Sequence, residues 1–330
     1  MIRTVLLFGL VATLAACGDG QPLFPDEDGG NGNGGGGNGN GSSGSLSRSE
    51  EQDDAGGGYI EDVSYDRASD TFFVDNLAFD GDNVYTRDED VRTLSGSDSR
   101  ARYRVYEGDE LVRDPGNGTP IEQSTYRAIY GESENRTEDG EPVTTFAIVR
   151  TGTYVGYGFG GFVYERNGGV DLPTNGQAAY SGDYAGLRTF DGVAAGDRME
   201  YTTGDVDIAI DFRDFNEGRG VQGEITNRRA FDLEGNRIAT GPRPNQLHLP
   251  DLIFDVGPGT VTDDGELTNE LRSYALDDSG NPAEYETGTY YAIIAGDNAD
   301  EIVGVFVVES DDPRFEDVTA QETGGFIVYR

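Results

Sequence analysis

The chain has 330 residues, with 62 acidic against 24 basic residues and a formal net charge of -38 at pH 7. Because the acidic residues are spread along the whole chain, nucleic acid and anionic membrane surfaces are disfavoured as partners. The single cysteine excludes a disulfide framework, so the fold must be held together by its core. A solubilising surface is the simpler interpretation of the acidic excess, and a surface for cations or for a basic partner is the alternative.

The N-terminal segment MIRTVLLFGLVATLAACGDG carries Arg3, an apolar run and then Cys17. The run is too short to span a bilayer and has the length of the apolar region of a signal peptide. Cys17 follows Leu-Ala-Ala, which resembles a bacterial lipoprotein signal, in which the cysteine becomes the lipidated first residue. We predict a signal peptide over 1–16, lipidation of Cys17, and a place at the outer membrane, on its surface or periplasmic face. An ordinary signal peptide is the alternative, and Asp19 leaves retention at the inner membrane open, because an acidic residue near that position favours it in some bacteria.

The next segment, 17–58, is dominated by glycine, asparagine and acidic residues and shows no apolar periodicity. Such a segment buries too little apolar surface to offset the entropy lost on ordering. We predict a disordered tether with a reach on the order of 35 Å.

The remainder of the chain is predicted to be all-β, because it is rich in glycine and tyrosine and has short alternating segments. The clearest strand is DVDIAIDF, 205–212, in which apolar and acidic residues alternate, and 221–226 alternates again after a turn, which predicts a hairpin. A short helix is the weaker expectation for 266–273. Further strands are expected at 70–79, 101–106, 125–130, 144–150, 153–164, 178–187, 197–203, 249–255, 286–294, 301–309 and 324–330.

Motifs in the second half resemble the β-barrel domain of transferrin-binding protein B and related bacterial surface lipoproteins. The first is DLPTNGQAAYSGDYAGL, 171–187, with Leu-Pro-Thr, a glycine and a Tyr-x-Gly-x-Tyr strand. In the order of that family follow a hairpin at 204–227, a second hairpin at 287–308 and a final strand GGFIVYR at 324–330. Ala292 and Asp297 depart from the pattern, where a glycine and a proline are usual.

The resemblance implies an eight-stranded antiparallel barrel over 169–330, with a β-rich handle subdomain over 59–168 beside it. A cluster of proline, glycine and asparagine over 165–176 marks the same boundary. The resemblance further implies binding rather than catalysis, with a protein or a metal or solute carrier met by loops at one end of the barrel. It does not imply transferrin itself.

Glycine in the barrel strands is interpreted as structural. Tyr180 and Tyr184 share one face with Gly182 between them, so we expect Gly182 to make room for a ring, and Gly288 to have a similar role. We expect apolar side chains to fill the barrel interior evenly, which is the usual arrangement with eight strands.

No catalytic residue and no cofactor are predicted. His248 is the only histidine, and no serine lies in the strand-turn-helix setting of a nucleophile. A glycosidase with paired carboxylates and a nucleotide loop at 156–161 are both disfavoured, because tryptophan platforms and a following helix with Lys-Ser are missing. Any bound metal stays unknown, although the acidic turns 80–90 and 277–286 have oxygen ligands suited to calcium.

The segment GPRPNQLHLP, 241–250, is a loop with bases and little acid in an acidic protein. We predict that Arg243 and Leu247 in this loop contact the partner. The alternative function is that of an acidic structural or shielding envelope lipoprotein with no specific ligand. A binder should expose an apolar or aromatic patch at a loop end, whereas a shield should show uniform charge.

Overall fold

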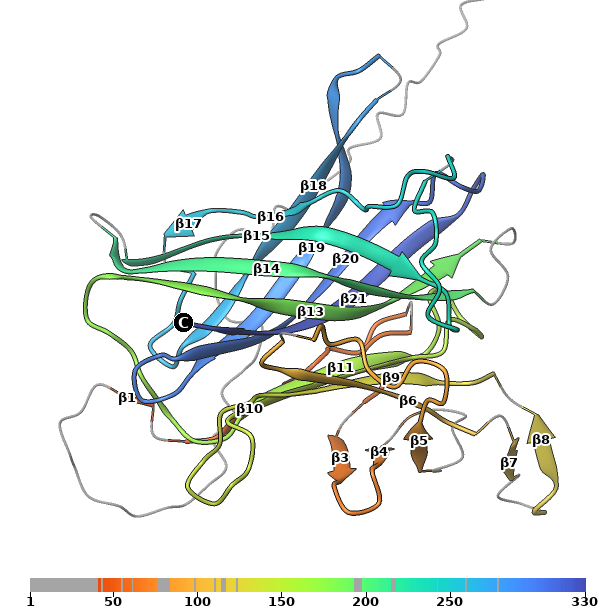
Figure 1. The fold of residues 1–330 in the computed structure, drawn as a ribbon, viewed down its shortest axis with the longest axis horizontal. Coiled ribbons are helices and arrows are strands. Elements are labelled where there is room, and N and C mark those ends of the chain that lie inside the picture. The colour runs from red at the N-terminus through yellow and green to blue at the C-terminus, as the bar shows by residue number, and fades with distance from the viewer. Residues whose placement is uncertain are drawn as a thin grey trace, which may run out of the picture. The chain divides into compact units, whose positions relative to one another are not determined.

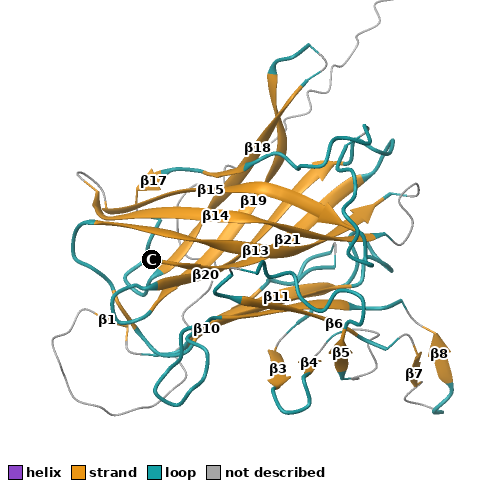
Figure 2. Cartoon of the chain, in the orientation of Figure 1, coloured by secondary structure: helices purple, strands orange, loops and turns teal. Residues whose placement is uncertain are grey.

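The computed structural model describes residues 41–330, except 43, 55, 61, 76, 78–83, 98, 110, 114–116, 123, 193–197, 215–217, 242, 259 and 278. The predicted signal peptide, Cys17 and most of the predicted tether lie outside the described residues. Within these residues every regular element is a β-strand, which confirms the all-β prediction (Figures 1 and 2). None of the described residues forms a helix that could cross a membrane.

The second half of the chain forms a closed antiparallel barrel. Its sheet has nine strands in the order β14-β13-β21-β20-β19-β18-β16-β15-β17, and β14 also pairs with β15. Since β17 (Gly257–Pro258) pairs only with β15, the other eight strands form the ring, as predicted. These are β13 (Gln177–Asp191), β14 (Met199–Asp214), β15 (Gly218–Phe231), β16 (Leu252–Phe254), β18 (Glu266–Leu276), β19 (Pro282–Ala295), β20 (Glu301–Asp311) and β21 (Thr319–Tyr329).

Two details of the barrel differ from the sequence prediction. The expected hairpin is present as β14 and β15, but the strands expected at 197–203 and 205–212 are one strand with a bulge around Gly204. The helix expected over 266–273 is wrong, because these residues form β18, paired along its length with β19. Leu267 and Leu271 are both buried, and a spacing of four residues places two side chains on one side of a helix and of a strand alike.

The first half forms a second antiparallel sheet, the handle, in the order β2-β11-β10-β9-β6-β5-β4-β3. Two small strand pairs, β1 (Gly41–Ser42) with β12 (Val170–Asp171) and β7 (Leu111–Arg113) with β8 (Pro120–Glu122), lie outside both sheets. The handle strands are β2 (Leu46–Ser49), β3 (Asp62–Asp66), β4 (Thr71–Asp75), β5 (Tyr85–Arg87), β6 (Arg102–Glu107), β9 (Arg127–Glu132), β10 (Thr144–Arg150) and β11 (Gly160–Arg166).

The handle also departs from the prediction: β3 and β5 are not among the expected strands, and two further differences concern β11 and β2. The strand expected over 153–164 begins only at Gly160, because Gly152, Gly156 and Gly158 all have positive φ and turn the chain before it. Leu46–Ser49, which the sequence assigns to the tether, forms the edge strand β2 and pairs with β11. Glu50, just after it, lies 3.0 Å from the guanidinium of Arg150.

The handle packs against the outer surface of the barrel through side chains from both parts. The ring of Phe146 on β10 lies between Gly131 of the handle and Gly325 of the barrel, and a Cβ at either glycine would come within 2.2 Å of that ring. Tyr103 on β6 inserts its hydroxyl between two paired barrel strands, where it donates to the Asp183 carbonyl at 2.6 Å and accepts from the Ile327 amide at 3.0 Å. The two sheets therefore interlock instead of resting on a flat contact.

The barrel interior is divided into two halves, so the expected even apolar fill is wrong. One half is an apolar cluster that includes Tyr180, Val206 and Phe306. The other half is charged: the buried guanidinium of Arg228 donates to Glu286 at 2.6 and 2.9 Å and to Glu322 at 2.8 Å. Burial disfavours the charged forms of Arg228 and Glu286. Their mutual pairing outweighs this effect, so the pKa of Arg228 lies above its ordinary value and the pKa of Glu286 lies below its ordinary value.

Glycines inside the barrel make room for neighbours, although not as predicted. A Cβ on Gly182 or Gly288 would collide with the backbone of the adjacent strand, at Ile327 and Val307, and not with a ring. Rings occupy the space over other glycines: Tyr184 lies over Gly204, Phe326 over Gly304 and Phe306 over Gly324. Close approach of backbones and of rings thus explains why glycine recurs in these strands.

Candidate binding site

The connections β13–β14, β15–β16, β18–β19 and β20–β21 meet at one end of the barrel, which we name the loop end. Both predicted contact residues lie in its β15–β16 connection, where Arg243 is exposed and Leu247 is half-buried. A turn joins them, since the Gln246 amide donates to the Arg243 carbonyl at 3.0 Å. The guanidinium of Arg243 makes no hydrogen bond or ion pair with a described residue, so it is available to a partner.

His248 holds the shape of this loop. Its exposed ring nitrogen lies 2.9 Å from the guanidinium of Arg237, which also donates to the Leu247 carbonyl at 3.1 Å. The hydroxyl of Thr240 donates to the His248 carbonyl at 2.9 Å. Because the ring faces an arginine and not a serine and a carboxylate, these contacts fit a structural role for His248 better than catalysis.

Arg314, from the β20–β21 connection, fastens several parts of the loop end together. Its guanidinium donates to Glu200 on β14 at 2.8 Å and to the Ala239 carbonyl of the β15–β16 connection at 3.0 Å. The same guanidinium donates to Asp312 at 2.8 Å. Burial alone would raise the pKa of Asp312, but the hydrogen bonds and the charge of Arg314 hold it below its ordinary value. The charged half of the barrel interior therefore continues into a network that orders the loops before any partner arrives.

The sequence reasoning missed an exposed apolar pair beside these loops. The ladder between β16 and β18 ends at Leu252 and Ser273, and beyond it β18 pairs only with β19. On this projecting hairpin, which is prominent in Figure 1, Tyr274 is 50% and Leu276 is 72% exposed. The sequence signal for this exposed pair is the spacing of Tyr274 and Leu276, two residues apart, directly before an acidic turn.

Only 277–281 of the acidic segment 277–286 form a turn, because β19 begins at Pro282. The carboxylate of Asp277 accepts hydrogen bonds from the amides of Asn281 and Ser279, both at 2.8 Å, and these bonds hold its pKa below the ordinary value. No group of three or more potential metal ligands among histidine, cysteine, aspartate and glutamate is assembled in the part of the chain that the structure describes. Residues 80–83 of the other acidic turn lie outside that part.

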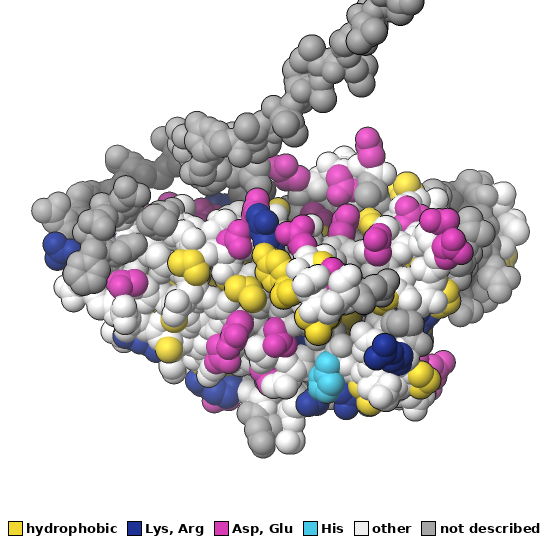
Figure 3. Space-filling model, turned by 90° about the horizontal axis from the view of Figure 1, so that it is seen from above, with side chains coloured by type: hydrophobic (Ala, Val, Ile, Leu, Met, Phe, Trp, Pro, Cys, Tyr) yellow, Lys and Arg dark blue, Asp and Glu magenta, His cyan; other side chains and the backbone are white. Residues whose placement is uncertain are grey.

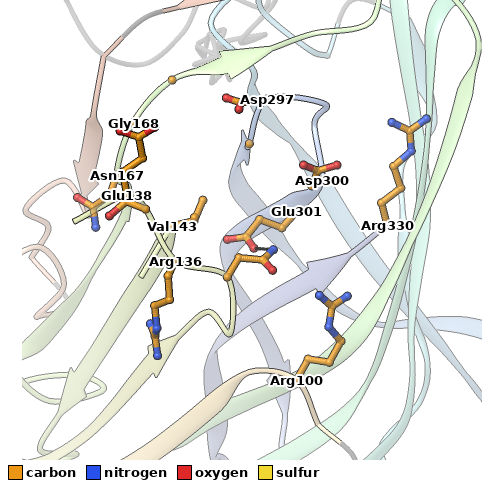
Figure 4. Close-up of a pocket in the computed structure, with 14 residues that line it drawn as sticks. Arg100, Arg136, Glu138, Val143, Asn167, Gly168, Asp297, Asp300, Glu301 and Arg330 are labelled. Atoms are coloured by element: carbon orange, nitrogen blue, oxygen red, sulfur yellow. Dashed lines mark hydrogen bonds between the residues drawn. The ribbon is translucent and has the colours of Figure 1, made fainter. Parts of the chain in front are cut away.

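A pocket of about 720 Å³ lies away from the loop end, where the handle meets the turn between β19 and β20 (Figure 4). Three arginines, Arg100, Arg136 and Arg330, and several carboxylates line it. Its buried acid is Glu301, which accepts hydrogen bonds from Thr144 at 2.7 Å, Ser133 at 2.8 Å and the Asn135 amide. Burial raises the pKa of Glu301 despite these bonds.

This pocket can hold a small polar molecule, because its charges are mixed and its walls are hydrophilic. All three donors to Glu301 come from the handle, so this carboxylate mainly connects the handle to the barrel.

No protein-family model matches the chain, and no curated protein sequence matches it significantly. Solved structures do match. Transferrin-binding protein B of Haemophilus parasuis Hp5 matches over 83% of this chain and 46% of its own, with 12% identity and a TM-score of 0.34. The chain thus spans about half the length of that structure.

Two further structures match over a smaller part of this chain. A surface lipoprotein matches over 58% of this chain and 78% of its own, with 14% identity and a TM-score of 0.25. Transferrin-binding protein B of Actinobacillus pleuropneumoniae H49 matches over 58% and 79%, also with 14% identity and a TM-score of 0.25. The solved structures that are similar to this chain are thus of the class that its sequence motifs resemble, transferrin-binding protein B and surface lipoproteins.

Proposed function

We propose that this chain is a lipid-anchored binding protein of the bacterial outer membrane, which captures a protein or a metal or solute carrier through the loop end of its barrel. The main observation in support is the exposure of Tyr274 and Leu276, at 50% and 72%, on a hairpin that projects beyond the barrel. Exposed apolar side chains that lie together on a surface often mark a site where a partner binds. Aromatic residues are also frequent among the residues that dominate binding energy.

The surroundings of this pair support binding over shielding. A shield with no ligand would carry uniform charge at the loop end, whereas this end combines an exposed apolar hairpin with the base Arg243 and the half-buried Leu247. The contacts of Arg314 order the connections in advance, and ordered loops lose less entropy when they bind. Lipidation at Cys17 would hold this surface at the membrane, and the tether would let the folded part extend from it.

Capture by whole cells tests the proposal. Cells that carry the full chain are incubated with fluid from their natural environment, and retained proteins are identified by mass spectrometry. We expect wild type to retain a protein whose retention falls about tenfold or more in the Tyr274→Ser/Leu276→Ser and Arg243→Ser/Leu247→Ser variants. Truncation of a residue that dominates an interface costs about 2 kcal/mol or more, and each pair is proposed to contain such a residue.

The matched control is Glu138→Gln/Asp139→Asn, a double change at an exposed turn of the handle. This variant should retain the same protein as wild type. The proposal is wrong if the loop-end variants capture as well as the control does, or if wild-type cells retain nothing above cells that lack the chain.

A further inference from the structure

The handle covers β14 near its start, where Tyr201 donates a hydrogen bond to Asp88, but no described handle residue lines the groove further along, over 207–209 of β14, 222–224 of β15 and 253–256. We name this uncovered part of the outer surface the open wall. Its residues follow from the strand register: Ala179, Ala209 and Gln222 form one row across β13, β14 and β15, and Asp207, Glu224 and Ile253 form the neighbouring row across β14, β15 and β16. Their neighbours along each strand, such as Val206 and Ile208, point into the barrel and are buried.

The open wall has an apolar groove. A depression of about 430 Å³ is floored by small residues, among them Ala209 and Gly223, and is flanked by Ile253 and Val256. Ile253 is 48% and Val256 is 73% exposed, so two branched side chains face water on one side of the groove. Figure 3 shows hydrophobic side chains gathered in the middle of the face seen from above, with mostly acidic but also basic side chains beside them.

The carboxylates beside the groove are placed against one another. Asp207 on β14 lies directly opposite Glu224 on β15, and both line the groove. Like charges at directly opposed positions destabilise a pair of strands. Both side chains are exposed, and neither Asp207 nor Glu224 has a hydrogen bond or ion pair with a residue that the structure describes. The barrel itself gains nothing from this arrangement.

We propose that the open wall is a second docking surface, for a basic protein segment that carries an apolar side chain between lysines or arginines. The apolar side chain would enter the groove between Ala209 and Ile253, and the flanking cations would meet Asp207 and Glu224. Charge complementarity selects this occupant over a second copy of the chain, because two open walls would bring the same carboxylates together. The surface is distinct from the loop end, since Tyr274 and Leu276 lie beyond the last pair of the β16–β18 ladder.

Three labelled peptides of equal length test the proposal with the full chain. In the first, lysine alternates with leucine; in the second, lysine alternates with serine; in the third, glutamate alternates with leucine. We expect the first to bind most tightly by fluorescence anisotropy at low salt, the second more weakly and the third not at all. If the lysine–serine peptide bound as tightly as the lysine–leucine peptide, charge alone would explain the binding, and the role of the apolar groove would be rejected.

Variants separate this surface from attraction by net charge. Asp207→Asn/Glu224→Gln should lower the affinity for the lysine–leucine peptide about tenfold, which is within the range that two exposed ion pairs together supply. Glu138→Gln/Asp139→Asn removes the same charge from the handle and should change binding little. Equal losses in both variants would mean that only the net charge attracts the peptide, and the docking surface would be rejected.

The apolar part has its own pair of variants. Ile253→Ser should weaken the same peptide, whereas Leu276→Ser, an equally polar change at the loop end, should not. Hydrogen exchange on wild type provides a measurement without substitutions: peptide should protect amides in 205–211 and 220–225 and leave 241–250 unchanged. Protection confined to 241–250 would assign the peptide to the loop end and overturn the open wall, while leaving the proposed capture function intact.

Discussion

The barrel has two outer surfaces that differ, although they enclose the same interior. The covered wall, which packs on the handle, includes Leu187, Ile293, Val303 and Ile327, all of which are nearly inaccessible to water. The open wall carries acids and small or polar residues at the outward positions of 205–211 on β14 and 220–224 on β15. In 302–306 of β20 and 326–329 of β21, which are buried on both faces, the residues are hydrophobic apart from Gly304, whereas β14 alternates.

The comparison shows how one barrel can present a permanent contact and a free surface. On the covered wall, glycine lets a ring approach the backbone, as Phe146 does at Gly325, and the contact is closed. On the open wall, small residues form a groove with no described side chain lying in it, and opposed carboxylates lack a basic partner among the described residues. Packing dominates the first surface and charge dominates the second.

The largest expected effect is a substitution at the covered wall. Phe146→Ala should lower the free energy of unfolding by about 3–5 kcal/mol, because it leaves a cavity between Gly131 and Gly325. Ile253→Ala on the half-exposed open wall should cost about 0.5 kcal/mol or less, as surface changes usually do. Urea unfolding of both variants measures the difference. Similar losses would contradict the distinction between the two walls.

A smaller effect concerns the dependence of the handle contact on pH. The pKa of Glu301 is raised by burial above its ordinary value of 4.5, so the folded chain holds this proton more tightly than the unfolded chain. The contribution of Glu301 to stability is therefore fully present below pH 4.5, where both states bind the proton. This contribution is lost as pH rises through the raised pKa of the folded chain.

The variant Glu301→Gln isolates this contribution, since other carboxylates such as Glu132, with a lowered pKa, act in the opposite direction. Urea midpoints of wild type and Glu301→Gln should be compared at about pH 7 and about pH 5. Wild type should gain stability relative to the variant at the lower pH. A difference that stays constant between the two pH values would show that Glu301 does not titrate in this range.

The smallest expected effect is a gain on the open wall. Asp207→Asn removes one charge of the directly opposed pair with Glu224, so the free energy of unfolding should rise by about 0.2–1 kcal/mol. The gain should shrink in high salt, because both side chains are exposed. Chemical unfolding at low and high salt measures it. A loss of stability would mean that Asp207 has a structural role in the isolated chain.

By itself the sequence determined the all-β class and the β14–β15 hairpin, whereas the closed barrel of the second half was an expectation from the resemblance of its motifs to a known family. Alternation in DVDIAIDF separates an inner from an outer face, and turn residues mark where strands end, so both features can be read locally. Local pattern could not separate strand from helix at β18, because Leu267 and Leu271 fit either period. Pairing with β19 decided it.

Only the tertiary structure decided which outer face is covered and what fills the barrel. In sequence, Arg228 and Glu286 look like ordinary surface charges, and they become an interior pair only because distant strands bring them together. In the same way, alternation identifies an outward residue but not its neighbour, so Asp207 and Ile327 cannot be assigned to an open and a covered wall without the fold. The exposed Tyr274 and Leu276 depend likewise on where the ladder with the short β16 ends. Long-range contacts determine these features, and they leave no local period in the chain.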